Sequence, residues 1–184
     1  GQYISVTECP ECNHRSYNYE SFSTINLPIS LDDSIVEPNI YHCFDLLTKT
    51  EQLDADNKLE CDGCKTYQQV TKKLYFWETP ATIILFFNRF LDIANSDKEI
   101  DFPIDNLDIN KYCFNYNPSD NNIFNLIGIG IYCGNGHAGH YSAIIKNQNG
   151  KWYHIDDEDV NEINEDIILI NKKFAYCLLY QKCS

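Results

Sequence analysis

The sequence has no methionine and no long hydrophobic run. Its apolar stretches all fall short of the roughly 20 residues that a bilayer-spanning helix needs, and the first residues, GQYISVTECPEC, are neither basic nor apolar enough for a signal peptide. We therefore expect an intracellular protein, cytoplasmic or nuclear, without a membrane partner. Because the 184-residue chain starts at Gly1 without an initiator, we also expect it to be a piece of a longer protein.

Basic residues are scarce as well. Lysine and arginine total 14 against 27 acidic residues, which leaves a net charge of -13. Since nucleic-acid affinity comes mainly from neutralising phosphates, this balance argues against a nucleic-acid partner and disfavours a zinc-ribbon module that binds nucleic acid. A partner with a basic surface would be attracted instead. With 43% hydrophobic and 14% aromatic residues, the chain is typical of a globular protein.

Cysteine, by contrast, is abundant, with nine residues. Cys9 and Cys12 form one Cys-x-x-Cys pair, and Cys61 and Cys64 form a second. Each pair can direct two thiolates at one ion, and four thiolates make the closed tetrahedral site of a single structural zinc. Gly63 suits the tight turn of the second pair. The alternatives are two unrelated pairs of buried thiols or, with less support, a redox motif.

The hydrophobic pattern predicts an α+β fold that is mostly β. Residues 40–47 carry apolar side chains at helical spacing after Asn39, a suitable N-cap. Residues 17–29 alternate as a strand or a hairpin arm does, and everything after the helix is typical of strands, with 83–87 expected at the centre of a sheet. Gly128 and Gly130 leave one face of the strand at 124–132 bare, which indicates close approach by another group.

One hairpin brings two polar residues to the same end of a ladder. Asn149-Gly150 is a strong turn signal between residues 142–145 and 152–155, so His140 starts one arm and Asp156 ends the other. A two-residue loop would offset them by three positions, about 10 Å, and a longer loop would bring them closer. A carboxylate that orients a histidine prepares it to act as a general base. The alternative is that both are ordinary surface residues.

These features together resemble the ubiquitin-specific proteases, which are cysteine deubiquitinases. The similarity covers nearly the whole chain in order, through F-x-x-I-x-L-P-I at 22–29, EQLDADNK at 51–58, the second Cys pair, Thr79-Pro80, Asn88-Arg89-Phe90, Asp101-Phe102-Pro103, Gly139-His140-Tyr141, Ile155-Asp156-Asp157 and Ala175-Tyr176. The resemblance implies the antiparallel palm sheet of a papain-like cysteine protease, with zinc-ribbon fingers. Residues 1–75 would form the fingers with one helix, and residues 76–184 the palm.

The resemblance also implies roles for individual residues. His140 would be the general base, Asp156 would orient it and Asp157 would assist. Ubiquitin, or a ubiquitinated protein, would be the partner, and its tail would meet Glu51, His137, Gly139 and Tyr141. Zinc would be held by Cys9, Cys12, Cys61 and Cys64.

The family's nucleophile lies in an N-terminal Cys box, and this sequence has no such box. We therefore expect the fingers and palm without the thumb segment that carries the nucleophile, and a chain that is inactive alone. Cys133, seven residues before His140, lies at the end of a strand and opens no helix, so it lacks the helix N-terminus that activates a nucleophilic thiol. The alternative function is a catalytically inactive ubiquitin-binding module.

Overall fold

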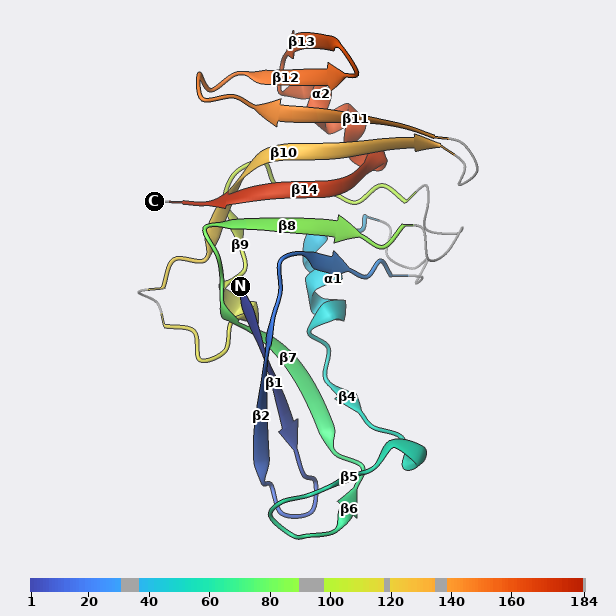
Figure 1. The fold of residues 1–184 in the computed structure, drawn as a ribbon, viewed down its shortest axis with the longest axis vertical. Coiled ribbons are helices and arrows are strands. Elements are labelled where there is room, and N and C mark those ends of the chain that lie inside the picture. Colours follow the sequence, from blue (N-terminus) through green and yellow to red (C-terminus); the bar gives the residue numbers. More distant parts are fainter. Residues whose placement is uncertain (31–36, 90–97, 118–119, 135–138, 184) are drawn as a thin grey trace.

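A computed structural model describes residues 1–30, 37–89, 98–117, 120–134 and 139–183. The chain forms a small sheet at one end and a large sheet at the other, joined by the long strand β7 (Thr71–Glu78) and the helix α1 (Ile40–Leu47) (Figure 1). A third, two-stranded sheet of β5 (Leu59–Glu60) and β6 (Tyr67–Gln68) caps the free end of the small sheet. In the described residues, no helix is long and apolar enough to cross a membrane.

The small sheet has four strands in the order β2-β1-β7-β4, all antiparallel. Its strands other than β7 are β1 (Gln2–Glu8), β2 (Arg15–Ser21) and β4 (Glu51–Gln52). Ile4 pairs with Tyr19 on one side and Tyr75 on the other, and it is fully buried. Because β2 follows β1 through a short turn, the first Cys pair lies at the tip of this hairpin.

The large sheet has the strand order β13-β12-β11-β10-β14-β8-β3, and β9 pairs beside it with β10. All its pairs are antiparallel except β3 with β8. Its strands are β3 (Ile25–Leu27), β8 (Thr82–Phe87), β9 (Leu107–Asp108), β10 (Ile123–Gly134), β11 (Gly139–Lys146), β12 (Trp152–Asp156), β13 (Asp159–Ile163) and β14 (Ala175–Lys182).

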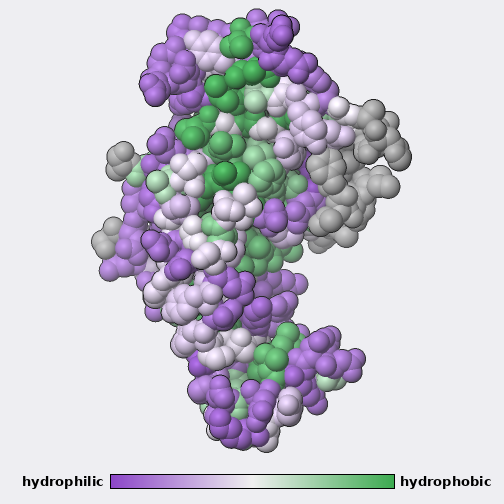
Figure 2. All heavy atoms as spheres, in the orientation of Figure 1, coloured by the Kyte–Doolittle hydropathy of each residue, from purple (hydrophilic) through white to green (hydrophobic). Residues whose placement is uncertain are grey.

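One hydrophobic core lies against the large sheet and extends to β7. Phe44 of α1 stacks at 5.1 Å from Tyr112 and 6.1 Å from Phe76 of β7, so the helix joins the two sheets. At the other end of the sheet, Ile168 is fully buried in the short helix α2 (Asp166–Asn171). Figure 2 shows hydrophobic residues gathered along the visible face of the large sheet, with hydrophilic residues at the top.

The predicted helix is confirmed. Asn39 caps it by accepting hydrogen bonds from the N–H groups of Tyr41 and His42, at 3.0 and 3.3 Å. His42 Nδ1 in turn accepts from the N–H of Asn39, which closes a capping box. Ile40, Cys43 and Phe44 make up its buried stripe, as their spacing predicted.

The structure differs from the sequence pattern in three places. The strand or hairpin arm expected over 17–29 is two strands in different sheets: β2, which is an arm of the hairpin with β1, and β3. The strand β8 is next to the edge rather than central, and its residues are alternately buried and half-buried. Residues 166–171, in the region predicted to contain only strands, form the helix α2. Its apolar run is too short for the hydrophobic period to distinguish a helix from a strand.

The subdomain boundary at residue 75 stays a prediction. Of the elements that precede it, β3 pairs with β8 of the large sheet, and α1 contacts both the large sheet's core and β7 of the small sheet.

Candidate functional site: a four-thiolate cluster and a histidine–carboxylate pair

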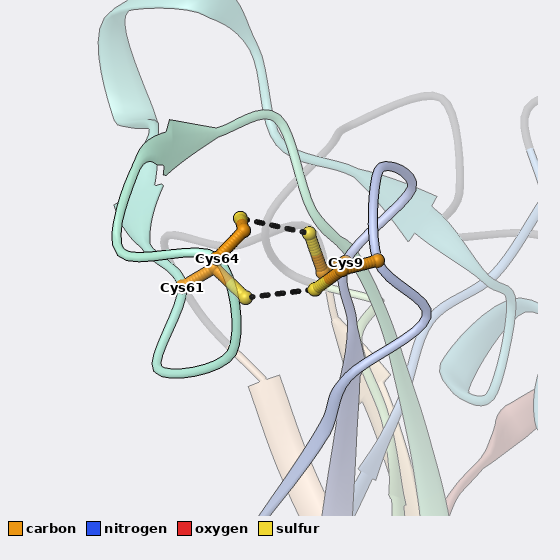
Figure 3. Close-up of side chains that lie close together, drawn as sticks. Cys9, Cys61 and Cys64 are labelled. Atoms are coloured by element: carbon orange, nitrogen blue, oxygen red, sulfur yellow. Dashed lines mark hydrogen bonds between the residues drawn. The ribbon is translucent and has the colours of Figure 1, made fainter.

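The four cysteines of the two pairs converge at the tip of the small sheet. Cys9 and Cys12 lie in the turn between β1 and β2, and Cys61 and Cys64 lie in the turn between β5 and β6 (Figure 3). Their sulfur atoms all lie within 4.8 Å of one another. The Cys9–Cys64 and Cys12–Cys61 sulfur pairs are 3.9 and 3.5 Å apart.

The two turns have the same local structure. In each, the N–H of the residue after the second cysteine bonds to the carbonyl of the first cysteine, from Asn13 to Cys9 at 2.9 Å and from Lys65 to Cys61 at 2.8 Å. Asn13 and Lys65 both have φ of 56°, the left-handed conformation that reverses the chain after each pair. This matched geometry folds each Cys-x-x-Cys segment into a knuckle that presents both sulfur atoms on one side.

Gly63 allows the two knuckles to approach each other. A Cβ atom at this position would lie 2.8 Å from His14 Cβ and 3.0 Å from Cys12 Sγ, closer than real side chains pack. The Gly63 N–H also donates to Cys61 Sγ at 3.4 Å. Donation from the Cys64 and Gly63 backbone amides lowers the pKa of the Cys61 thiol to about 6, which favours the thiolate form that binds metal.

The cluster fits zinc. Four sulfur atoms at about 2.3 Å from one tetrahedral Zn²⁺ lie about 3.8 Å from each other, close to the 3.5 and 3.9 Å found here. A closed set of four thiolates has no open position for substrate or water, so the site is structural. Such an ion would clamp the β1–β2 turn to the β5–β6 turn, 48 residues further along the sequence.

The hairpin of β11 and β12 brings His140 and Asp156 together. Its connection spans residues 147–151, with Gly150 at φ 80° and hydrogen bonds of 2.9 Å from Gly150 to Asn147 and from Asn147 to Lys151. Lys146 therefore pairs with Trp152. In this register Asp156 is offset from the position opposite His140 by two residues.

An offset of two keeps both side chains on the same face of the sheet, because side chains alternate along a strand. The two-residue loop would have given an offset of three and opposite faces. His140 Nε2 and Asp156 Oδ1 form a hydrogen-bonded ion pair. The pair is solvent-accessible, with 53% of the His140 side chain and 44% of the Asp156 side chain exposed.

Asp157 completes an acidic environment for the histidine. It has φ of 51° in the turn to β13, and its carboxylate lies within 4.8 Å of the ligand atoms of His140 and Asp156. The hydrogen bond and charge of Asp156 raise the pKa of His140, and the charge of Asp157 adds to the rise. A carboxylate can only accept, so Asp156 fixes the ring proton on Nε2 and leaves Nδ1 free to accept another.

Of the other residues predicted to touch substrate, Gly139 and Tyr141 flank His140 on β11. A Cβ at Gly139 would lie 2.3 Å from the ring of Tyr132, so a side chain there would require that ring to move. Tyr141 is 56% exposed; its ring is tilted against Tyr132 and meets Tyr176 edge-on, with ring centroids 4.8 and 5.5 Å apart. Glu51 lies exposed in β4 of the small sheet. His137 falls outside the described residues.

The bare face of β10 is covered by neighbouring side chains. A Cβ at Gly130 would lie 3.1 Å from both Cys177 and the ring of Tyr176, and one at Gly128 would lie within 3.9 Å of Leu179 and Ile145. The close approach that the two glycines indicated is therefore made by strands of the same sheet.

The structure places three further polar residues on the His140 face: Cys133, which the sequence disfavoured as a nucleophile, and Ser142 and His154, which it did not single out. Cys133 lies directly opposite His140 in the β10–β11 register, and its thiol is exposed. One row further along, His154 Nε2 lies 3.1 Å from Ser142 Oγ. This pair repeats the diagonal geometry of Asp156 and His140. The sequence signal that could have found Ser142 and His154 was the alternation of side chains along both arms of the hairpin. Using it requires the strand register, which the sequence left open.

Comparison with known proteins agrees with this geometry. A family described as ubiquitin carboxyl-terminal hydrolase matches residues 1–180. Human ubiquitin carboxyl-terminal hydrolase 15 is 37% identical over 145 residues, which cover 76% of this chain and 14% of that protein. Human ubiquitin carboxyl-terminal hydrolase 21 is 30% identical over 186 aligned residues, 98% of this chain and 32% of that protein.

Solved structures show the same fold. In a SAGA DUB module containing a Ubp8 variant bound to monoubiquitin, the matched chain is 30% identical, with a TM-score of 0.86 over 100% of this chain and 40% of its own length. In a related module bound to ubiquitin aldehyde, the values are 28%, 0.84, 100% and 41%. Both similarities extend over the small and the large sheet.

The fold and the four-cysteine cluster define a deubiquitinase catalytic domain, in its fingers and palm portion. The chain belongs to the ubiquitin carboxyl-terminal hydrolase family, whose members are thiol-dependent ubiquitin hydrolases. It spans about a third or less of the length of the curated relatives it matches. The small sheet with its cysteine cluster corresponds to the fingers, and the large sheet to the palm.

Proposed function

We propose that this chain is the fingers and palm part of a deubiquitinating cysteine protease that cleaves peptide or isopeptide bonds at the C-terminal glycine of ubiquitin. The observation that carries the proposal is the contact between His140 and Asp156 on one face of the β11–β12 hairpin, within the region that matches the family. Ubiquitin or a ubiquitinated protein is the substrate. The nucleophilic cysteine belongs to a thumb segment that precedes Gly1 in the parent protein.

In the proposed mechanism, His140 is the general base. Asp156 holds its Nε2–H, so Nδ1 accepts the proton of the nucleophilic thiol. The thiolate attacks the carbonyl carbon of the terminal glycine. The C–N bond breaks, the leaving amine takes the proton from His140, and a thioester remains. Water then gives a proton to His140 and cleaves the thioester, which regenerates the thiol and releases ubiquitin.

Asp156 and Asp157 support this cycle electrostatically. Both carboxylates favour the imidazolium that forms when His140 takes the thiol proton, in keeping with the raised pKa of that residue. Asp156 also fixes the ring orientation, whereas Asp157 contributes mainly charge. Zinc on the four cysteines takes no part in the chemistry and keeps the fingers rigid.

The substrate contacts follow from the position of each residue. Tyr141 offers an exposed aromatic surface beside the base, and Gly139 leaves room for the Tyr132 ring at the same strand end. The ubiquitin tail would pass over these residues and over His137. Glu51, exposed on β4, would form an ion pair with an arginine of the tail.

The test is a substitution of the assigned base in the parent protein. The parent protein with His140→Ala should bind ubiquitin as the wild type does but should lose cleavage of a ubiquitin–aminocoumarin substrate by at least 100-fold, because general-base catalysis contributes about 10²–10⁴-fold. The control is Lys151→Gln, a surface change at the opposite end of the same hairpin, which should keep full activity. Activity unchanged by His140→Ala would refute the assigned base. Ubiquitin binding without cleavage in the wild type would show an inactive ubiquitin-binding module.

A further inference from the structure

Among the described residues, no further strand pairs with β2, the outer edge strand of the small sheet. The edge strand β2 has seven residues, all exposed, and Figure 1 shows it along the outer side of the sheet with β1 as its neighbour. We propose that β2 is a docking edge that an extended, basic segment of another protein joins as an additional strand. This site is separate from the His140 hairpin and goes beyond the proposed function.

Alternate residues of β2 hydrogen-bond to β1, and the backbone groups of the residues between them face outward. Gly1 and Phe22 exchange two hydrogen bonds, at 3.0 and 2.9 Å. At the other end of the ladder, the N–H of Cys9 donates to the carbonyl of His14 at 3.0 Å. Both pairs fix the same alternation, and the register between them is continuous.

In an antiparallel ladder every second residue directs its N–H and C=O at the neighbouring strand, and the residues between direct theirs outward. Counting from Phe22 and His14, the residues bonded to β1 are Ser16, Asn18 and Glu20. The outward backbone groups therefore belong to Arg15, Tyr17, Tyr19 and Ser21. These four residues present a regular row of donors and acceptors to an added strand.

The same residues that open the backbone also carry exposed aromatic rings. Tyr17 and Tyr19 are each 50% exposed. Tyr19 meets Trp77 of β7 edge-on at 5.3 Å, and Tyr17 meets Phe114 at 6.0 Å. Trp77 is itself 46% exposed, so the aromatic face continues from the edge across the sheet. An added strand would place every second side chain beside the two tyrosines, where apolar residues would be buried.

Of the usual devices that block a strand edge, β2, with the sequence RSYNYES, has two charged side chains, Arg15 and Glu20, but no proline, lysine or bulge. Its single cation, Arg15, is bound to Glu8 of β1 at 2.6 Å. Natural edges of this length are normally interrupted by such devices, so an open one indicates a partner.

Charge identifies the kind of partner. The first 24 residues carry three acidic side chains and one basic side chain, and the basic one, Arg15, already neutralises Glu8. Glu20 stays exposed on the face opposite the tyrosines, next to Asn18. A second copy of this chain would bring another net charge of -13 to the edge, which opposes self-pairing. The fitting segment alternates apolar residues, over the tyrosines, with lysine or arginine on the Glu20 face.

The experiment uses a fluorescent nine-residue peptide in which lysine alternates with valine and tyrosine. Its control has the same composition with the apolar residues in one block. Anisotropy titrations with the full-length protein should give binding at least tenfold tighter for the alternating peptide. Tyr19→Thr removes the ring and keeps the outward N–H, whereas Tyr19→Pro removes both. Because this N–H does not serve the β1 ladder, proline is tolerated there, and we expect Tyr19→Pro to bind at least tenfold more weakly than Tyr19→Thr.

Amide exchange gives a second measurement that needs no variant. The outward amides of Tyr17 and Tyr19 should exchange fast in the free protein and slow at least tenfold with the alternating peptide, while the inward amide of Asn18 is protected in both. Equal binding of the two peptides, or unchanged exchange at Tyr17 and Tyr19, would overturn the proposal. A concentration-dependent dimer that Tyr19→Pro abolishes would assign the edge to a second copy instead. Displacement of the peptide by monoubiquitin would assign it to the substrate surface.

Discussion

The sharpest test of the zinc cluster is the substitution Gly63→Ala. Carbon atoms in contact lie about 3.5–4.0 Å apart, whereas the new Cβ would be 2.8 Å from His14 Cβ. The two knuckles would have to separate by about 0.7 Å, beyond the deviation of about 0.2 Å that metal–ligand distances tolerate. We expect zinc affinity to fall about 10–100-fold, as when an outer-shell partner of a metal ligand is changed, or by about 1.4–2.8 kcal/mol.

The assay is a competition titration with a chromophoric zinc chelator, with the bound metal quantified by mass spectrometry. Gly128→Ala is the matched control, because its Cβ would make its nearest contacts at an ordinary 3.7 Å and would leave zinc affinity unchanged. Adding His14→Gly to Gly63→Ala removes the shortest contact and should recover part of the lost affinity. Zinc affinity of Gly63→Ala within twofold of the wild type would refute the argument from knuckle distance.

Three further changes test other parts of the structure. Asp156→Asn removes the charge that raises the pKa of His140, so the ring should lose its proton at lower pH than in the wild type in an NMR titration of its Cε1–H; an unchanged midpoint would contradict the ion pair. Asn39→Ala removes the cap of α1 and should lower the free energy of unfolding, measured by urea denaturation, by about 1 kcal/mol. An unchanged free energy of unfolding would show that the capping hydrogen bonds do not stabilise the helix. Phe44→Ala should lower the free energy of unfolding by about 3–5 kcal/mol in the same assay, because the ring is fully buried between Tyr112 and Phe76. A loss no larger than that caused by Leu47→Ala, at a half-buried position of the same helix, would contradict this packing.

The sequence predicted local structure wherever a short segment sets its own geometry. Asn39 and the apolar stripe after it predicted α1, because a cap and a helical period act within a few residues. The two Cys-x-x-Cys pairs predicted one four-thiolate cluster, since two-residue spacing lets each pair meet the same ion. The order of motifs along the chain predicted the family that the comparison confirmed.

The pairing of strands that are far apart in the sequence could not be predicted in the same way. The alternating pattern over 17–29 indicated β-structure, but it could not show that β2 would join the small sheet and β3 the large one. Strand partners so far apart in sequence are chosen by burial of the whole face, as when β3 pairs with β8. Likewise α2 gave too short an apolar run to be recognised as a helix.

The sequence by itself determined which residues compose the candidate site, namely the four cysteines and the histidine and aspartate at the arms of one hairpin. The tertiary structure decided whether the histidine and aspartate could meet. The connection over residues 147–151 sets the register in which Lys146 pairs with Trp152, and this puts His140 and Asp156 on the same face. A shift of one residue would have turned one of them away, because side chains alternate along a strand. Ile144 and Trp152, which are buried in the core on the same face, favour the register that this connection sets.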